Sequence, residues 1–225
     1  MFFCGYDSYD HIAKAHKTNV PVVVLDREIQ DRDIPSVLID NTLAMKNAFQ
    51  YLYNLGHRKI GFITFPFENQ TTVRRRYEGY VNGIRDNNLK YDPDIVIIDE
   101  LMRLDELKGT YTLIKKKVEQ DKIATAYLTL ADFLALGAMH ALREMGLDVP
   151  GDVSVMGFNN EIICAFSDPP LTTVKQPKKL MGETAADLLL NIVEGKKIEN
   201  DHIVLDTSII ERSSTASPGR KFSRV

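Results

Sequence analysis

Cysteine is scarce in this sequence, and so are the features of secreted and membrane proteins. The two cysteines in 225 residues, Cys4 and Cys164, are too few for a disulfide framework and are not spaced as metal ligands. No uninterrupted apolar run approaches the roughly 18 residues of a membrane span, and residues 1–10 lack the order of a secretion signal. The sequence therefore predicts a soluble protein of a reducing cytoplasm.

An excess of positive charge is also absent. The 28 lysines and arginines are outnumbered by 31 aspartates and glutamates, so the net charge of −3 indicates no basic surface for nucleic-acid phosphates. Hydrophobic residues make up 44% of the chain and charged residues 26%, which is typical of a folded protein and too apolar for a disordered one. We expect a globular chain of one or two domains that makes no direct contact with nucleic acid.

Sequence signatures of catalysis are missing. The chain has no GxxxxGKS/T phosphate loop, no GxGxxG or GxSxG turn and no HExxH helix, and its cysteines and histidines are not spaced to hold zinc. The neighbouring Asp99 and Glu100 define no acid–base pair, because acidic neighbours are common in loops. These absences predict a protein that is not an enzyme and has neither a metal nor a cofactor.

The sequence does contain an alternation of short β-branched runs with amphipathic stretches of helical spacing. This alternation predicts an α/β fold with parallel sheets flanked by helices. Strands are expected at residues 20–25, 60–64, 95–98, 124–129, 153–158, 172–174 and 203–205. Helices are expected at residues 41–55, 75–87, 104–119, 132–145 and 177–194.

Particular residues refine these elements. Asp132 suits the N-cap of its helix, and the pair Gly79 and Gly83 indicates close packing of one helix on another. Three glycines suit the left-handed residue that follows a helix, namely Gly56, Gly146 and Gly195.

The beginning of the chain is unusual. It opens on Phe2, Phe3 and Cys4, a pattern typical of the middle of a buried strand. Because the inner strands of a parallel sheet are paired and covered on both sides, we expect earlier strands to be missing and the chain to be a fragment. The polar tail at residues 213–225 is expected to be loose.

Polar residues follow most of the predicted strands. In an open parallel sheet, ligands bind beyond the carboxyl ends of the strands, so these residues form the expected binding edge. They are Asp26 and Arg27, residues 64–72, Asp99 and Glu100, Ala131 and Asp132, Asn159 and Asn160, and Gln176. Acids, amides, hydroxyls and an arginine cluster suit hydrogen bonding to a small polar molecule.

Structural roles compete with binding at several of these positions. Asp132 could simply cap its helix, and Asn159 and Asn160 could simply turn the chain. At most one or two of the three arginines at residues 74–76 can point towards a ligand from one helix. His57 follows a helix-ending glycine, where an imidazole can bond terminal carbonyls, so a structural role is favoured over a catalytic one.

Six strings follow one another along the chain. They are LGHRKIGFI (55–63), RYEGY (76–80), ALGA (135–138), GLDVPGDVSVMGF (146–158), PPLTTVKQP (169–177) and IERSST (210–215). In this order and spacing they closely resemble the effector-binding domain of the LacI/GalR family of bacterial transcriptional repressors. The resemblance runs from about Cys4 to about Ser214, nearly the whole chain.

The resemblance implies the two-lobed fold of type I periplasmic binding proteins. Three crossovers between the lobes would fall near Asp40 and Asn41, near Gln176 and near Asp206. The lobes and tail would be residues 1–41 with 177–205 (first lobe, incomplete), residues 42–176 with 206–212 (second lobe), and residues 213–225 (tail). The family's helix-turn-helix head, hinge helix and first strands would precede Met1.

The resemblance also implies an effector site. Arg76 matches the arginine of the family's R-x-x-G motif, which reaches the effector from the second lobe, and Thr72 matches a hydroxyl position just before it. Asn159 matches the acid that follows the G-F/Y step, and Asp26 a polar position after a first-lobe strand. The remaining expected site residues are Asp132, Gln176 and Tyr6.

The implied function is effector binding and dimerisation in a cytoplasmic, homodimeric, DNA-binding regulator. A small polar metabolite, a sugar or a derivative, would bind between the lobes and control operator binding by the absent N-terminal head. Two departures, Ala131 for the family's asparagine and Asn159 for its aspartate, weaken the case for a sugar held in the usual way. The alternative is a solute-binding receptor of a sugar transporter, which shares the fold and would carry a secretion signal upstream.

Overall fold

The computed structural model describes residues 2–3, 10–18, 20–27, 34–67 and 70–219. The chain divides into two compact units, each formed from separate stretches of sequence. Unit 1 comprises Met1–Asn41, Phe67–Arg75 and Gln176–Thr207, and unit 2 comprises Thr42–Pro66, Arg76–Lys175 and Ser208–Val225. The assignment of residues to two ligand-binding lobes stays a prediction.

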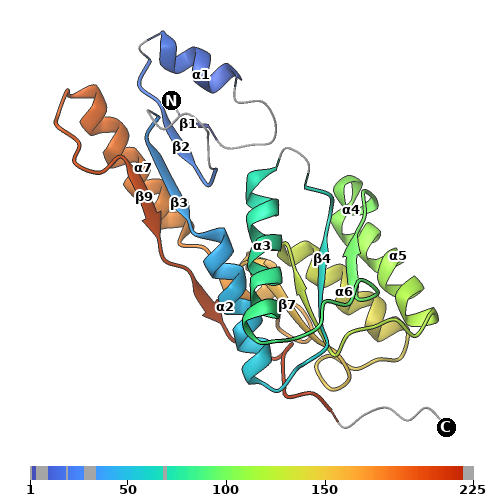
Figure 1. The fold of residues 1–225 in the computed structure, drawn as a ribbon. Helices are drawn as coiled ribbons and strands as arrows, with labels where there is room; N and C mark the ends of the chain where they lie inside the picture. The colour runs from blue at the N-terminus through green and yellow to red at the C-terminus, as the bar shows by residue number, and fades with distance from the viewer. Residues whose placement is uncertain (1, 4–9, 19, 28–33, 68–69, 220–225) are drawn as a thin grey trace. The chain divides into compact units, whose positions relative to one another are not determined.

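Unit 1 is built on a parallel four-stranded sheet in the order β1-β2-β3-β9 (Figure 1). The strands are β1 (Phe2–Phe3), β2 (Val23–Leu25), β3 (Ser36–Ile39) and β9 (His202–Leu205), and the helices are α1 (Asp10–Lys17) and α7 (Lys178–Val193). Helix α7 packs on β2 and β3, while Ile12 of α1 joins a buried apolar cluster with Val22, Val24 and Ile34. These contacts give unit 1 a small core of its own.

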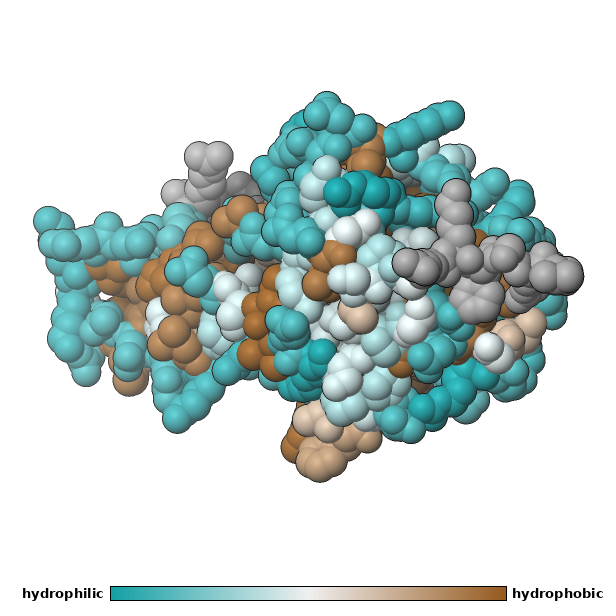
Figure 2. Space-filling model, turned by 90° about the horizontal axis from the view of Figure 1, so that it is seen from below, coloured by the Kyte–Doolittle hydropathy of each residue, from teal (hydrophilic) through white to brown (hydrophobic). Residues whose placement is uncertain are grey.

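The surface of unit 1 keeps apolar side chains exposed. On the face drawn in Figure 2, hydrophobic residues gather most densely over α7 and β9, whereas unit 2 is largely hydrophilic or neutral. Leu190 and Val193 on α7 and Val204 on β9 are more than half exposed. Unit 1 therefore leaves apolar side chains of α7 and β9 uncovered.

Unit 2 is built on a six-stranded sheet in the order β10-β8-β7-β6-β4-β5. Its strands are β4 (Ile60–Thr64), β5 (Val96–Ile98), β6 (Ala126–Thr129), β7 (Ser154–Asn159), β8 (Thr172–Lys175) and β10 (Ser208–Ile210). Neighbours pair in parallel except β10, which runs antiparallel to β8. Every residue of β4 and β6 is buried, as expected for strands covered on both faces.

Helices cover both faces of the unit 2 sheet (Figure 1). Helices α2 (Asn41–Asn54) and α3 (Thr71–Asp86) lie on one face, and α5 (Glu106–Glu119) and α6 (Asp132–Glu144) pack together on the other. The connections carry the short helix α4 (Leu101–Leu104) and the 3₁₀ turn η1 (Ile162–Ala165). Helix α3 belongs to unit 1 up to Arg75 and to unit 2 from Arg76 onward.

The glycine pair in α3 packs against α2 as predicted. A methyl group at Gly79 would collide with the backbone oxygen of Thr42, and one at Gly83 would collide with the ring of Phe49. Only hydrogen side chains allow these two helices to approach so closely. The predicted glycine helix ends are also confirmed, since φ is positive at 107° for Gly56, 77° for Gly146 and 68° for Gly195.

The α/β fold with parallel sheets is confirmed, while several boundaries differ from the predictions. The strand expected at residues 20–25 begins only at Val23, because Pro21 has no amide hydrogen for a ladder. Strands β3 and β10 and helix α1 were not predicted. Segments this short carry too little periodicity to be distinguished from loops.

Two helix starts are corrected by the structure. The helix expected at residues 104–119 is interrupted at Asp105, whose extended backbone ends α4 and whose carboxylate accepts a hydrogen bond from the Lys108 amide at 2.9 Å. The N-cap of α6 is Ala131, not Asp132, which is the first helical residue. The Asp132 carboxylate instead accepts hydrogen bonds from residues distant in sequence, which are described below.

His57 has the structural role that was favoured, although with other partners. Its Nδ1 lies 3.0 Å from Thr125 Oγ1, and its Nε2 lies 3.1 Å from Ser154 Oγ and 2.9 Å from the Ala216 carbonyl. The imidazole therefore ties the segment after β10 to the amino ends of β6 and β7. Burial lowers the pKa of His57, partly offset by the Ala216 carbonyl.

Candidate functional site

The strands of unit 2 end together at one edge of the sheet. Because β4, β6, β7 and β8 are parallel neighbours, their last residues Thr64, Thr129, Asn159 and Lys175 lie at this edge, which we call the carboxyl edge. Open parallel sheets bind ligands beyond such an edge. Several of the residues predicted to bind an effector lie in the loops that follow.

Arg76 reaches the carboxyl edge from α3. Its side chain is only 4% exposed, and its Nη1 donates hydrogen bonds to the Leu130 carbonyl at 2.8 Å and to Asn159 Oδ1 at 3.4 Å. The guanidinium carbon lies 3.7 Å from the centre of the Phe158 ring, a cation–π contact. The structure thus brings Arg76 and Asn159 together and fixes the direction of a buried positive charge.

Asn159 and Asn160 turn the chain and also take part in contacts. Both have positive φ, 112° and 53°, conformations that asparagine adopts more readily than most residues. Asn160 Oδ1 accepts a hydrogen bond from Arg212 Nη2 at 2.7 Å, and Arg212 Nη1 donates to the Leu171 carbonyl at 2.6 Å. Asn160 therefore belongs to a structural network, whereas Asn159 faces Arg76.

Asp132 is held inside unit 2. Its carboxylate is fully buried and accepts hydrogen bonds from the Thr173 hydroxyl at 2.5 Å and from the Glu161 amide at 2.7 Å. Gly157 leaves room for it, since a side chain there would collide with the carboxylate. Burial raises the pKa of Asp132, although the bond from Thr173 counteracts this. These contacts join α6, η1 and β8, and a ligand contact by Asp132 stays a prediction.

The remaining predicted site residues belong to unit 1. Asp26 follows β2 with a φ of 55°, and its carbonyl accepts a hydrogen bond from Thr72 Oγ1 at 3.3 Å. Gln176 is buried where the chain enters unit 1. Tyr6 lies outside the described residues. Within unit 1, therefore, the structure brings Thr72 and Asp26 together.

Gln70 was not singled out from the sequence, although it lies within the loop at residues 64–72. It is 9% exposed, and within the described part of the chain its Oε1 has no hydrogen-bond partner. A buried amide oxygen without a donor is rare in folded proteins and is commonly satisfied by a ligand or a water molecule. The feature that distinguishes Gln70 is its burial. The sequence alone does not show that a glutamine in a loop is buried.

A second arginine at the carboxyl edge was also missed. Arg103 of α4 lies over the Phe65 ring at 5.4 Å, pairs with Glu100 Oε2 at 3.0 Å and donates to the Pro66 carbonyl. Leu104 next to it is the most exposed large apolar residue described. The loop after β5 therefore offers a cation and an apolar side chain, where the sequence indicated only the acids Asp99 and Glu100.

Neither a metal centre nor a membrane span is found in the described residues. No three histidine, cysteine, aspartate or glutamate side chains in this part of the chain cluster closely enough to hold a metal ion. None of its helices has the length and hydropathy required to cross a bilayer. The polar groups of the carboxyl edge can hydrogen-bond a ligand.

Comparisons with known proteins agree with this fold. A family model described as "Periplasmic binding protein-like domain" matches residues 49–215. The transcriptional regulator MalR of Streptomyces coelicolor is 35% identical over 204 residues, which cover 90% of this chain and 58% of MalR. The transcriptional repressor CytR of Escherichia coli is 32% identical over 204 residues, 88% of this chain and 57% of CytR.

Three solved structures show the same fold. A LacI-family regulatory protein from Chloroflexus aggregans has a TM-score of 0.82 and 30% identity, with 91% of this chain and 72% of that chain covered. A LacI-family regulator from Enterococcus faecium with bound ribose has a TM-score of 0.80 and 28% identity, with coverage of 93% and 76%. A dimeric Lac repressor has a TM-score of 0.79 and 29% identity, with coverage of 93% and 74%.

The chain therefore belongs to the periplasmic binding protein-like domain family and, within it, to the effector-binding domains of LacI-family transcriptional regulators. This family consists of regulators and not of enzymes, so the expectation that the chain is not an enzyme is confirmed. The chain spans less than three fifths of the length of MalR and CytR.

Proposed function

We propose that the chain binds a small polar metabolite, a sugar or a sugar derivative, and that this binding controls how a LacI-type regulator engages its operator. The observation that carries the proposal is Arg76, a buried guanidinium held in place at the carboxyl edge by Leu130 and Phe158. A cation fixed in advance loses little conformational entropy when it bonds a ligand oxygen. The ribose in the Enterococcus faecium relative supports this ligand class.

We assign further ligand contacts to both units. In unit 2 these are Arg76 and Asn159, and in unit 1 Thr72, Asp26, Gln176 and Tyr6. The unsatisfied amide oxygen of Gln70 supports the unit 1 assignment, because it calls for a hydrogen-bond donor such as a sugar hydroxyl. Asn159 can both accept and donate, unlike the aspartate usual at this position, so it suits a neutral hydroxyl.

The mechanism is a population shift. A ligand that bonds groups of both units favours one arrangement of the two, and that arrangement changes operator binding by a DNA-reading head. Moving an equilibrium from 1:99 to 99:1 requires a preference of about 5.5 kcal/mol, which a few charge-assisted hydrogen bonds of about 1.5–3 kcal/mol each can supply. A regulator of this kind works in the cytoplasm, where its operator is.

A homodimer is part of the proposal. The side chains Ile162 and Phe166, at η1 in unit 2, are 83% and 78% exposed, and Ile163 of the same turn is also exposed. Apolar side chains gathered around one turn indicate an interface, and the related Lac repressor is a dimer. A second copy of the chain is the partner we assign to this surface, since a two-fold operator requires a two-fold reader.

The ligand proposal is tested by calorimetric titration of the purified chain with a panel of pentoses, hexoses, disaccharides and nucleosides. For any ligand that binds, Arg76→Ala is expected to weaken binding at least tenfold, because it removes the fixed cation. The matched control is Arg74→Ala, which removes an exposed arginine from the same helix and should leave affinity unchanged.

Arg76 also bonds Leu130, so its substitution removes a structural contact as well. Circular dichroism therefore checks that both variants are folded. Equal affinities for the Arg76→Ala variant and the parent chain would remove Arg76 from the site. If the folded parent chain bound no sugar or nucleoside in the panel, the proposed ligand class would be wrong.

A further inference from the structure

Helix α7 of unit 1 has a second apolar side besides the one that packs on the sheet. Met181, Ala185 and Leu188 are its buried residues, and the helix packs on β2 and β3. Leu190 and Val193, in contrast, are more than half exposed. Figure 2 shows hydrophobic side chains gathered over this helix. Exposed apolar surface of this kind commonly marks a site that binds another protein.

The second apolar side of α7 has a regular spacing. It is formed by residues separated by four, three and four positions, namely Gly182, Ala186, Leu189 and Val193, which we call the α7 seam. This spacing puts side chains on one side of a helix and is typical of helices that pair along their length. None of the four residues is buried, and a methyl group on Gly182 would meet no described atom within 4 Å. The seam is therefore open to a partner.

The seam residues are small at the start of the seam and large at its end. If two copies of α7 pair in antiparallel directions, Gly182 of one copy lies opposite Val193 of the other, and Ala186 lies opposite Leu189. Each layer then combines a small side chain with a large one, so the side chains can interdigitate without voids. A parallel pair would instead place glycine on glycine and valine on valine. The order of sizes therefore favours the antiparallel arrangement.

The charges at the two ends of α7 favour the same arrangement. Its first turn carries Lys178 and Lys179 and no acid, its last turn has no basic residue, and its C-cap is Glu194. These charges oppose the dipole of their own helix, since acids are favourable near the N-terminus and bases near the C-terminus. In an antiparallel pair, the lysines of one copy lie beside the C-terminal end of the other copy, where Glu194 is. The two helices are thus complementary in charge.

Ion pairs within the chain do not prevent this contact, because they are exposed. Lys179 Nζ lies 3.6 Å from Glu183 Oε1, and Lys196 Nζ lies 2.6 Å from Glu194 Oε2. All four side chains are more than half exposed. Exposed pairs contribute little to stability, so these side chains can rearrange when a second helix approaches.

We propose that the α7 seam binds the α7 seam of a second copy of this chain, in an antiparallel contact with two-fold symmetry. This contact is separate from the one assigned above to η1, because α7 belongs to unit 1 and η1 to unit 2. A chain with two self-complementary surfaces assembles beyond a dimer. The seam therefore adds a second level of assembly to the homodimer of the proposed function.

The contact is tested by sedimentation velocity in a variant without the η1 surface, Ile162→Asp, Phe166→Asp. Both side chains are exposed, so this variant is expected to fold and to pair through α7 alone. Adding Val193→Glu should weaken the remaining dimer at least tenfold, because it places an acid in the seam. The matched control is Leu180→Glu, the same kind of change at a half-exposed position of α7 outside the seam, which should leave the dimer unchanged.

The antiparallel direction is tested by exchanging charges in the same variant. Lys179→Glu should weaken the dimer, because it brings an acid beside Glu194 of the second copy. Adding Glu194→Lys restores an opposite pair between the copies and should recover the lost affinity. Failure of this double exchange to recover any affinity would overturn the antiparallel arrangement.

Two other outcomes would overturn the proposal as a whole. If the Ile162→Asp, Phe166→Asp variant stayed monomeric at millimolar concentration, another occupant or none would cover the seam. If Val193→Glu weakened the dimer no more than Leu180→Glu, the contact would lie elsewhere. Circular dichroism checks the fold of each variant, and all seam variants share one background, so the result does not depend on whether η1 also pairs.

Discussion

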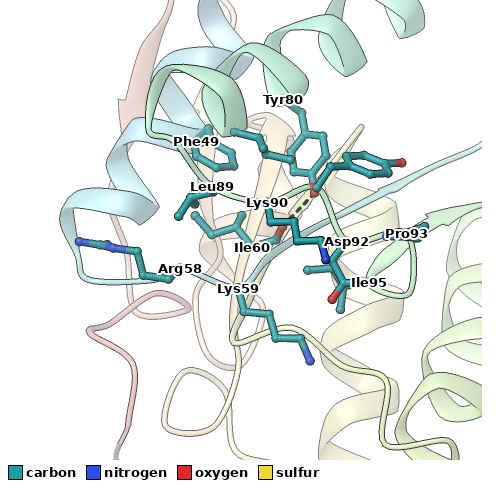
Figure 3. Close-up of a pocket in the computed structure, with 12 residues that line it drawn as sticks. Phe49, Arg58, Lys59, Ile60, Tyr80, Leu89, Lys90, Asp92, Pro93 and Ile95 are labelled. Carbon is teal, nitrogen blue, oxygen red and sulfur yellow. Dashed lines mark hydrogen bonds between the residues drawn. The ribbon is translucent and has the colours of Figure 1, made fainter.

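The two edges of the unit 2 sheet are built in opposite ways. At the carboxyl edge, buried polar groups bond one another: Arg76 bonds Leu130 and Asn159, and Asp132 bonds Thr173. At the amino edge near β4, the rings of Phe49 and Tyr80 are fully buried, and the lysines Lys59 and Lys90 above them are exposed (Figure 3). The first edge is suited to orienting a polar ligand by hydrogen bonds, whereas the second covers an apolar core with charged residues. One sheet can thus have two edges of different character, because its strands begin and end in different loops.

The largest expected effect concerns the buried network of the carboxyl edge. Asp132→Ala leaves the Thr173 hydroxyl and the Glu161 amide without an acceptor, which we expect to lower the free energy of unfolding by about 3 kcal/mol. Asp132→Asn keeps an acceptor oxygen and should cost less than half as much. Urea unfolding measures both. A loss below about 1 kcal/mol for the alanine variant would show that this edge is not held together by its polar network.

The packed helix pair α2 and α3 gives a sharper comparison. Gly79→Ala forces a methyl group against the backbone of α2, which cannot move, and should cost about 2–3 kcal/mol of stability. Gly83→Ala meets the Phe49 side chain, which can adjust more readily than a helix backbone, so we expect about 1–2 kcal/mol.

The control for these two variants is Gly182→Ala on α7, where an added methyl group meets nothing within 4 Å and the backbone is helical. It should stabilise the chain by about 0.4–1 kcal/mol. Thermal and urea unfolding rank the three variants. If Gly83→Ala proved as costly as Gly79→Ala, the amino edge would be as tightly packed as the rest of the unit.

The smallest expected effect is a pH dependence of the free energy of unfolding that is due to His57. Its imidazole bonds residues at the amino ends of β6 and β7. Because burial lowers the pKa of His57, the unfolded chain binds a proton more readily than the folded chain. Stability due to the neutral imidazole is therefore complete above the ordinary histidine pKa of about 6.5 and is lost as the pH falls below it.

Urea unfolding between pH 7.5 and 5.5 measures this slope, and the His57→Gln variant should have a shallower one. Equal slopes for the variant and the parent chain would assign the pH dependence to other groups. The same series also tests whether the segment around Ala216, which His57 holds, loosens at low pH.

Local features were the most predictable from the sequence. The strand at residues 60–64 has the predicted boundaries, and Gly56 and Gly146 end their helices in the predicted left-handed conformation. The break at Asp105 was missed although it is local, because an aspartate inside an amphipathic pattern is compatible with both a helix and a cap. Of the predicted site residues, the structure brings Arg76 and Asn159 together within unit 2, and Thr72 and Asp26 within unit 1.

The sequence by itself determined the alternation of strands and helices, the glycine helix ends and the family, because these depend on the order of neighbouring residues. Only the tertiary structure decided that Asp132 bonds Thr173 rather than capping α6, and that Gln70 is buried without a donor among the described residues. The physical reason is that burial and hydrogen-bond partners come from residues distant in the chain, and their proximity follows from packing rather than from sequence spacing.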